Sequence, residues 1–145
     1  MSVTNPLTRL PVLRPVPIFR GLTKPALLEV ARKTAEVAYP AGATLVKQGD
    51  PGDSLCIIAS GTVEVRRDDR VVAQMTAGDY FGEISLIDGR PRSATVVAVD
   101  DVVLLTLRAS DFGSLLSVPY VARAALAGLA ARVREAHAAH GPEPL

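Results

Sequence analysis

Glycine and proline recur at short intervals between Val37 and Leu107, and this spacing limits that part of the chain to short elements. The runs between them are rich in β-branched and aliphatic residues, which favour strands, and such a pattern is typical of a sandwich or barrel. In TVEVR (62–66), apolar and polar residues alternate, which predicts a half-buried strand. The predicted strands lie in TLVKQ (44–48), SLCIIAS (54–60), GTVEVRR (61–67), RVVAQMT (70–76), SATVVAV (93–99) and DVVLLTL (101–107). We expect the last two to form a hairpin at Asp100-Asp101.

The segment before these strands combines a proline-rich lead with a helical pattern. Four prolines within residues 6–17 predict an extended or turn-rich lead over residues 1–15, because proline fixes its own φ and disfavours α for the residue before it. Thr23 is a suitable N-cap and Pro25 suits a first helical turn, so a short amphipathic helix is predicted over 23–35. Its apolar stripe is expected to contain Leu27, Leu28 and Ala31.

Two helices are predicted after Leu107. Ser110 is expected to cap a short helix through Leu116, and Pro119 suits the first turn of a longer one. The longer helix has a heptad seam, which either packs on the strands or pairs with a second copy of the chain. Residues 139–145 are predicted to be a flexible tail. The seam consists of Ala122, Leu126, Leu129, Val133 and Ala136.

Length, charge and cysteine content exclude several classes of protein. The 145 residues suit one domain, and a net charge of +1 without long single-sign blocks does not indicate a nucleic-acid arm. Cys56 is the only cysteine, so no internal disulfide or thiolate metal site can form. It is expected to be a small buried hydrophobe, since no basic neighbour is evident in the sequence to lower its pKa. Without a signal sequence or 18 consecutive apolar residues, we expect a soluble cytoplasmic chain.

The stretch YFGEISLIDGRPRSATV (80–96) holds the residues best suited to chemistry. Glu83 and Arg92 are too far apart to pair within one helix, so another use is indicated. A helical turn entered through Gly82 would leave backbone N–H groups that favour an anion, and a guanidinium can meet two phosphate oxygens. A carboxylate beside a phosphate suits a ligand with a sugar hydroxyl. The pattern therefore predicts a site for a compact nucleotide monophosphate.

FGEISLIDGRPRSATV closely resembles the phosphate-binding cassette of the cyclic nucleotide-binding domains, and KQGDPGDSLCIIASGTVEV is similar to their glycine-marked β-roll. The resemblance covers about residues 16–138 and is closest to the domains of bacterial cyclic nucleotide-gated channels. It implies a mainly β fold, a jelly-roll-like double-stranded β-helix with an N-terminal helix and two C-terminal helices. It also implies a sensor that binds cAMP, with cGMP as the alternative, and reports to an unidentified effector protein by moving its last helix.

The resemblance implies a role for each residue of the site. Glu83 would bind the ribose 2′-hydroxyl and Arg92 the cyclic phosphate. Ser93 would offer a hydroxyl to phosphate or purine, without deciding the base. Arg132 would cap the base, although a solvated helix residue is the alternative. The anion pocket would be completed by the backbone of Gly82, Ile84, Ser85 and Ala94, and the ribose and purine would contact Val63 and Phe81.

Other functions fit the sequence less well. A cupin-like metal enzyme needs histidines on strands, whereas both histidines, His137 and His140, lie in the C-terminal segment. We therefore expect no enzyme, metal or cofactor. If this chain is the whole protein, we expect no DNA-binding helix-turn-helix in the few residues after the long helix. A structural or interaction module that has kept the fold but lost the nucleotide remains the alternative, against which Glu83 and Arg92 argue.

Overall fold

The structure, a computed structural model, describes residues 5–82 and 89–117, and beyond them Pro119, Ala122, Arg123, Leu126, Ala127 and Ala130. The strands are β1 (Ala35–Tyr39), β2 (Thr44–Val46), β3 (Ser54–Ser60), β4 (Thr62–Arg67), β5 (Arg70–Thr76), β6 (Tyr80–Phe81), β7 (Thr95–Ala98) and β8 (Val102–Arg108). The helices are α1 (Pro6–Leu13), the 3-10 turn η1 (Pro17–Phe19), α2 (Lys24–Lys33) and α4 (Ala109–Leu116).

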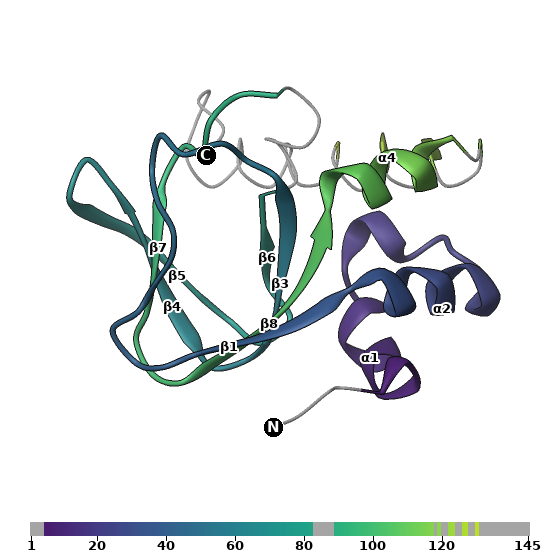
Figure 1. The fold of residues 1–145 in the computed structure, drawn as a ribbon, viewed down its shortest axis with the longest axis horizontal. Helices are drawn as coiled ribbons and strands as arrows, with labels where there is room; N and C mark the ends of the chain where they lie inside the picture. The colour runs from purple at the N-terminus through teal and green to yellow at the C-terminus, as the bar shows by residue number, and fades with distance from the viewer. Residues whose placement is uncertain are drawn as a thin grey trace.

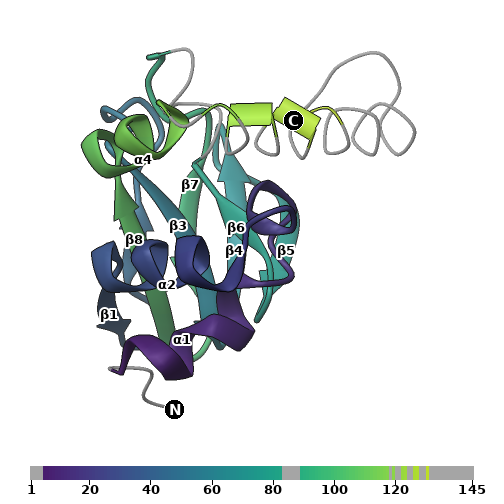
Figure 2. The same ribbon diagram turned by 90° about the vertical axis from the view of Figure 1, so that its right-hand side faces the viewer.

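The strands form two four-stranded antiparallel sheets, ordered β1-β8-β3-β6 and β2-β7-β4-β5. They face each other, while α1, α2 and α4 lie on the side of the first sheet (Figure 1). Seen from that side, α1 and α2 cross in front of the sheet (Figure 2). The predicted mainly β, jelly-roll-like fold with flanking helices is confirmed.

Strand β3 separates two buried clusters, which explains its uninterrupted apolar sequence. Leu55 and Ile57 pack with Leu27 and Val30 of α2 in the outer cluster, under the helices. Cys56 and Ile58 point the other way, into an inner cluster between the two sheets. Strand β8 alternates in the same manner. Because both faces of β3 are covered, the sequence SLCIIAS has no polar face, as expected for a fully buried strand.

The predicted hairpin at Asp100-Asp101 is wrong. Strand β7 pairs with β2 and β4, whereas β8 pairs with β1 and β3 in the other sheet, so these two residues turn a corner between sheets. Their carboxylates pin that corner: Asp100 Oδ1 accepts from the Thr62 N–H at 2.7 Å and Asp101 Oδ1 from the Ala41 N–H at 3.1 Å. The tight hairpin joins β4 to β5 instead, through Asp68 and Asp69, both with positive φ.

The prediction of an extended N-terminal lead is wrong as well, since α1 includes Pro6 and Pro11. Pro6 lies in the first turn, where the missing N–H is no loss, and Asn5 caps the helix by accepting from the Leu7 N–H. Pro11 is tolerated because tertiary contacts hold the helix, among them the fully buried Leu13. The domain boundary drawn at residue 16 stays a prediction, although Leu13 and Val16 share the outer cluster.

The remaining helices follow the sequence with smaller differences. Thr23 caps α2 as predicted, while the buried side of that helix consists of Leu27, Val30 and Ala31, with Leu28 half-buried. Ser110 lies inside α4 and is not its cap, because the helix begins one residue earlier, at Ala109. Strands β1 and β6 were not among the predicted runs. Among the described residues, no helix is both long and apolar enough to span a membrane.

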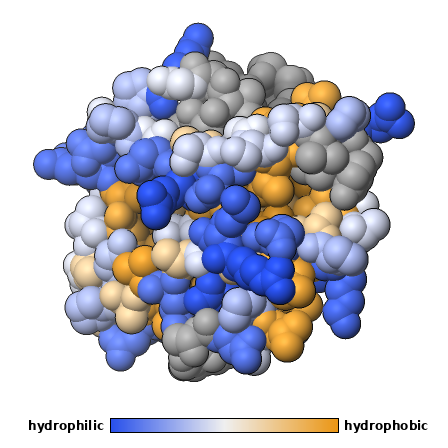
Figure 3. Space-filling view, turned by 45° about the vertical axis from the view of Figure 1, so that its right-hand side comes forward, coloured by the Kyte–Doolittle hydropathy of each residue, from blue (hydrophilic) through white to orange (hydrophobic). Residues whose placement is uncertain are grey.

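Few large apolar side chains of the described residues are exposed. On the face shown in Figure 3, hydrophilic residues surround smaller apolar areas. Of the heptad seam, Ala122 is half-buried and Leu126 is 67% exposed, so Leu126 does not pack on the β-roll. Leu129, Val133 and Ala136 lie outside the described residues. The exposed large apolar residues that the structure describes are Leu7, Val71, Val72, Val99 and Leu126.

Candidate functional site

Arg92 is the charged residue around which the candidate site is built. It lies just before β7, and its backbone is held by the loop that follows β2. The Arg92 N–H donates to the carbonyl of Asp50 at 2.8 Å, and the Arg92 carbonyl accepts from the Gly49 N–H at 2.9 Å. Arg67 adds a third contact by donating from Nε to the carbonyl of Ser93 at 3.2 Å. The position of Arg92 is therefore fixed by β-roll segments that are distant in the sequence.

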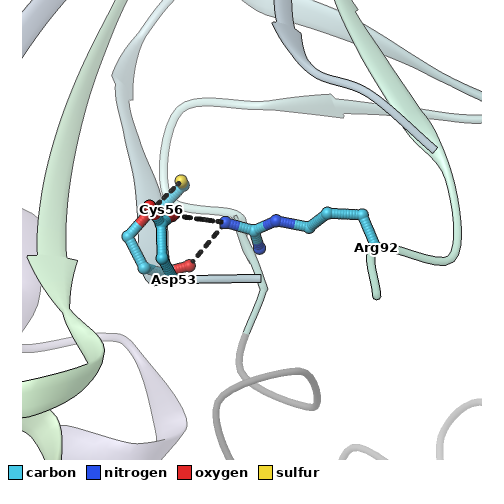
Figure 4. A network of polar contacts seen from close by, with 4 residues as sticks. Asp53, Cys56 and Arg92 are labelled. Atoms are coloured by element: carbon cyan, nitrogen blue, oxygen red, sulfur yellow. Dashed lines mark hydrogen bonds and ion pairs between the residues drawn. The ribbon is translucent and has the colours of Figure 1, made fainter. Parts of the chain in front are cut away.

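The guanidinium of Arg92 is 6% exposed and only partly satisfied. Its Nη2 donates to the carbonyl of Ser54 at 2.9 Å and to Ser54 Oγ at 3.3 Å, and lies 3.8 Å from Asp53 Oδ1 (Figure 4). Asp53 is 88% exposed, so water screens most of that attraction. Nη1 is buried without a hydrogen-bond partner among the described residues. A desolvated cation with an unused donor favours an anionic ligand.

Gly82 lies directly against this guanidinium. Its φ is +94°, a conformation that residues with a Cβ rarely adopt. A Cβ built here would collide with Arg92 Nη1 and would lie 2.6 Å from the carbonyl of Ser54. Glycine therefore allows the backbone at 82 to approach the guanidinium closely. The helical turn predicted to begin at Gly82 lies outside the described residues.

A cavity of about 400 Å³ opens beside Arg92. It lies at the rim between the sheets, with apolar residues from β2, β3 and β8 and charged residues from the loop between β2 and β3. Its walls combine two cations, two carboxylates and several hydroxyls with this apolar surface, so they suit a ligand with polar and apolar parts. The lining residues are Tyr39, Leu45, Val46, Lys47, Asp50, Pro51, Asp53, Ser54, Cys56, Arg92, Leu104 and Thr106.

Cys56 is 2% exposed, which confirms the prediction of a buried thiol. Burial raises its pKa, and the nearby Ser54 hydroxyl and Arg92 charge oppose this shift without overcoming it. The expectation that no basic residue lies near was wrong, because Arg92 is brought to β3 by the fold. Burial also raises the pKa of Tyr39 on the same cavity wall. Both groups are thus held protonated beyond their ordinary range.

The other predicted site residues are placed as follows. Val63 and Phe81 are buried in the inner cluster, next to Cys56 and Leu104 of the cavity wall, but do not themselves line this cavity. Ser93 is exposed and Ala94 half-buried, directly after Arg92. Their assignment to the ligand stays a prediction. The remaining predicted residues, Glu83, Ile84, Ser85 and Arg132, lie outside the described residues.

Asp53 and Ser54 were not predicted to belong to the site, although Ser54 accepts two hydrogen bonds from the guanidinium of Arg92 and Asp53 lies beside it. The signal was present in the sequence GDPGDS, where acidic residues and glycines precede a strictly apolar strand. A polar residue at the first position of a buried strand faces the rim of the sheet, where a ligand can reach it. No local feature, however, indicated that this rim would meet Arg92.

Together these features define a β-roll domain that presents a buried arginine beside a closely approaching glycine backbone, as an anion-binding domain requires. The chain belongs to the cyclic nucleotide-binding domain family, whose sequence model, described as "Cyclic nucleotide-binding domain", matches residues 36–118, more than half of the chain.

Relatives of known name support this membership. The chain is 44% identical over 102 residues to a cyclic nucleotide-gated potassium channel of Rhizobium etli, covering 70% of the chain and 28% of the channel. It is 38% identical over 126 residues to the cyclic AMP receptor protein of Thermus thermophilus, covering 83% and 58%. The regulatory domain of Toxoplasma gondii PKA, solved with cAMP, superposes with a TM-score of 0.74 at 26% identity, covering 90% of this chain and 50% of that one. The chain thus spans only part of these relatives.

Proposed function

We propose that the chain is a regulatory sensor module that binds a 3′,5′-cyclic purine nucleotide, with cAMP preferred over cGMP. The observation that carries the proposal is the buried Nη1 of Arg92, which lacks a partner among the described residues and lies against the backbone of Gly82. A cyclic phosphate carries one negative charge and is compact enough to meet such a donor. The names of the relatives, a cyclic AMP receptor protein and a cAMP complex among them, support the choice of ligand.

Calorimetric titration of the purified chain with cAMP, cGMP and AMP tests this proposal. We expect micromolar or tighter affinity for cAMP, somewhat weaker binding of cGMP and poor binding of AMP, whose uncyclised phosphate is a bulkier dianion. Equal affinities for AMP and cAMP would contradict the assignment. If neither cyclic nucleotide binds, the alternative of an interaction module without a nucleotide is favoured.

The Arg92→Gln variant tests the anchoring charge. Removing the cation that pairs with the phosphate is expected to cost roughly 2–5 kcal/mol of binding free energy, by analogy with truncated charge pairs. Arg70→Gln, on the exposed start of β5, is the matched control and should bind as wild type. Far-UV circular dichroism and thermal unfolding of both variants separate loss of binding from loss of fold. Unchanged affinity of a folded Arg92→Gln variant would show that the anchor is misassigned.

Glu83→Ala is expected to weaken binding less than a change at Arg92. The carboxylate would lose one hydrogen bond to the ribose, typically about 1.5–3 kcal/mol for a charged group. This order rests on the family resemblance, since Glu83 lies outside the described residues. The reverse order of the two losses in calorimetry would shift the anchoring role from Arg92 to Glu83.

We further propose that a bound nucleotide is reported to an effector protein through the C-terminal helix. A ligand can move this helix only if it contacts two helix arrangements differently, and Arg132 is the residue proposed to make that contact. Saturating cAMP should slow hydrogen exchange over residues 119–138 by at least about tenfold. Protection confined to residues 80–96 would mean that nucleotide binds without this relay. Light scattering with and without cAMP tests the homodimer alternative, which the exposed Leu126 favours.

A further inference from the structure

Gln48 joins three segments of the β-roll that are far apart in the sequence. Its backbone N–H donates to Thr95 Oγ1 at 2.9 Å, at the start of β7. Its side-chain amide makes a pair of bonds with Asp68 at the tip of the β4–β5 hairpin. Gln48 Nε2 donates to Asp68 Oδ1 at 3.0 Å, and Gln48 Oε1 accepts from the Asp68 N–H at 3.0 Å.

The residues next to Gln48 are those that hold Arg92. Gly49 donates to the carbonyl of Arg92 and Asp50 accepts from its N–H, so the loop after β2 and the Arg92 segment are bonded side by side. Arg67, the residue before Asp68, donates to the carbonyl of Ser93. The β4–β5 hairpin therefore contacts the Arg92 segment directly through Arg67. It also contacts the loop after β2, because Asp68 is paired with Gln48.

The hydrogen bonds between Gln48 and Asp68 are not explained by a contribution to the stability of the fold. Gln48 and Asp68 are both exposed, so their bonds compete with water and add little to stability individually. Two hydrogen bonds between the same pair of residues fix both the position and the orientation of the loop after β2. Asp68 is also held at a φ of +52°, so the tip itself has a defined shape. A binding arginine needs such support, because a small displacement of its guanidinium weakens its contact with the ligand.

We infer that Gln48 is a positioning residue for nucleotide binding, which acts through the backbone of Gly49 and Asp50 on Arg92 without touching the ligand. This inference rests on the proposed function. The tip of the β4–β5 hairpin is then part of the support of the phosphate site. We expect Gln48 and Asp68 to act together in holding Arg92 in place.

Three variants test the paired contact. Gln48→Glu keeps an acceptor for the Asp68 N–H but removes the donor and places a second carboxylate against Asp68. Asp68→Asn keeps an acceptor for Gln48 Nε2 and serves as the matched control. In the double variant Gln48→Glu/Asp68→Asn, the donor and acceptor are exchanged: the introduced amide can donate to the introduced carboxylate, and the backbone bond is retained.

The first measurement needs no nucleotide. In hydrogen exchange of the free protein, the amides of Gly49 and Arg92 should exchange at least about fivefold faster in Gln48→Glu and return to wild-type rates in the double variant. The amide of Ala98, which donates to the carbonyl of Ala43 at 2.8 Å, is the internal reference for global unfolding and should not change. A change at all three amides alike would mean general destabilisation and would overturn the inference.

The second measurement is the calorimetric affinity for cAMP. Gln48→Glu should bind about five- to tenfold more weakly, as expected for the loss of one hydrogen bond and the addition of a like charge. Asp68→Asn should bind within about twofold of wild type, and the double variant should recover most of the loss. Wild-type affinity of Gln48→Glu, or no recovery in the double variant, would overturn the inference while leaving the proposed function intact. Failure of the wild-type chain to bind would instead overturn the proposed function and, with it, the role of Gln48 in binding.

Discussion

Among the residues that the structure describes, the buried guanidinium of Arg92 has few hydrogen-bond partners. One carbonyl and one hydroxyl, both from Ser54, satisfy Nη2, and the nearby carboxylate of Asp53 is mostly solvated. Burying a cation in this way is costly unless another charge completes the site. The stability of the free protein is therefore partly given up at the position where a ligand phosphate would restore it, which is common at binding sites.

Substitution of Gly82 tests how closely backbone and guanidinium must approach. Gly82→Ala combines the strain of a positive φ with a collision against Arg92, so we expect it to lose more stability in urea unfolding than Gly78→Ala. Gly78 has nearly the same φ, +95°, but a methyl group there meets no heavy atom within 4 Å. We expect about 1–2 kcal/mol for Gly78→Ala from the backbone alone. Overpacking should add roughly 1–3 kcal/mol in Gly82→Ala, which should also bind cAMP more weakly. Equal losses would show that the guanidinium moves aside freely.

The sequence indicated Arg92 and Gly82 as candidate site residues, but it did not indicate the residues that contact Arg92. Arg92 and Gly82 were identified because they belong to one contiguous stretch, in which a glycine, a proline and an arginine have recognisable roles. Asp53, Ser54 and Gln48 were not identified because their contacts with Arg92 and Asp68 form only in the folded chain. The environment of Cys56 was misjudged for the same reason.

Among the elements, α1 shows how one buried polar side chain can join two helices. Arg9 is 8% exposed, and its Nη1 donates to the carbonyls of Ala31 at 3.1 Å and Thr34 at 2.6 Å and to Thr34 Oγ1 at 3.0 Å. Both carbonyls lie at the C-terminal end of α2, where a cation is favoured. The Ala31 carbonyl also accepts from the N–H and the hydroxyl of Thr34, so Arg9 matters most for the carbonyl of Thr34. The guanidinium of α1 thus completes the C-terminus of α2.

Arg9→Met should remove this cap while keeping an apolar side chain of similar length. The Thr34 carbonyl would lose its buried donor, which is expected to cost about 1–3 kcal/mol of unfolding free energy. Arg20→Met is the matched control, because Arg20 Nε also donates to a carbonyl, that of Pro15, but in an exposed setting. Chemical denaturation of both variants measures the difference. If the two changes cost the same, the Arg9 contacts contribute no more than a surface hydrogen bond.

At this scale the sequence predicted six of the eight described strands, but not how the strands pair. Alternation and β-branched runs identified β3, β4 and β5 well, since these signals are local. The hairpin at Asp100-Asp101 was wrong because a short polar turn can join strands within one sheet or between two. Strand β6 has two residues and carries too little pattern to be recognised. The proline-rich lead became α1 because packing of Leu13 and capping by Arg9 outweigh proline's local preference.

In the whole molecule, β3 and β8 form a shared wall with helices on one side and the second sheet on the other. The candidate site lies at the rim of the space between the two sheets, where β2 and β3 lie close to the Arg92 segment. The Arg92 segment is bonded to the loop after β2 and to Ser54 at the start of β3.

The raised pKa of Cys56 predicts a fall in global stability at alkaline pH. Burial holds its pKa above the ordinary value of 9.0, so above that pH the thiol ionises in the unfolded chain and stays protonated in the folded one. The unfolded state then binds fewer protons, and the free energy of unfolding decreases as pH rises. Well below pH 9.0 the thiol is protonated in both states, and its contribution to the free energy of unfolding does not change with pH. The pKa of Tyr39 is raised as well, so its ionisation in the unfolded chain lowers the stability in the same way above pH 10.0.

Denaturation of wild type and Cys56→Ala at several pH values separates this effect from other titrations. The stability difference between them should be constant up to about pH 8 and shrink toward about pH 10, since only wild type loses the thiol contribution. A difference that stays constant over the whole range would contradict a raised pKa at Cys56.

The burial of Cys56 also makes the chain convenient for site-specific labelling with a fluorescent dye. It is the only cysteine, it is almost inaccessible, and burial keeps it in the unreactive protonated form. A second cysteine introduced at an exposed turn, for example by Ala77→Cys between β5 and β6, would react with a maleimide dye far faster than Cys56. One fluorophore could then be attached at a chosen point without first replacing the native thiol, and the cavity wall beside Arg92 would keep its natural composition.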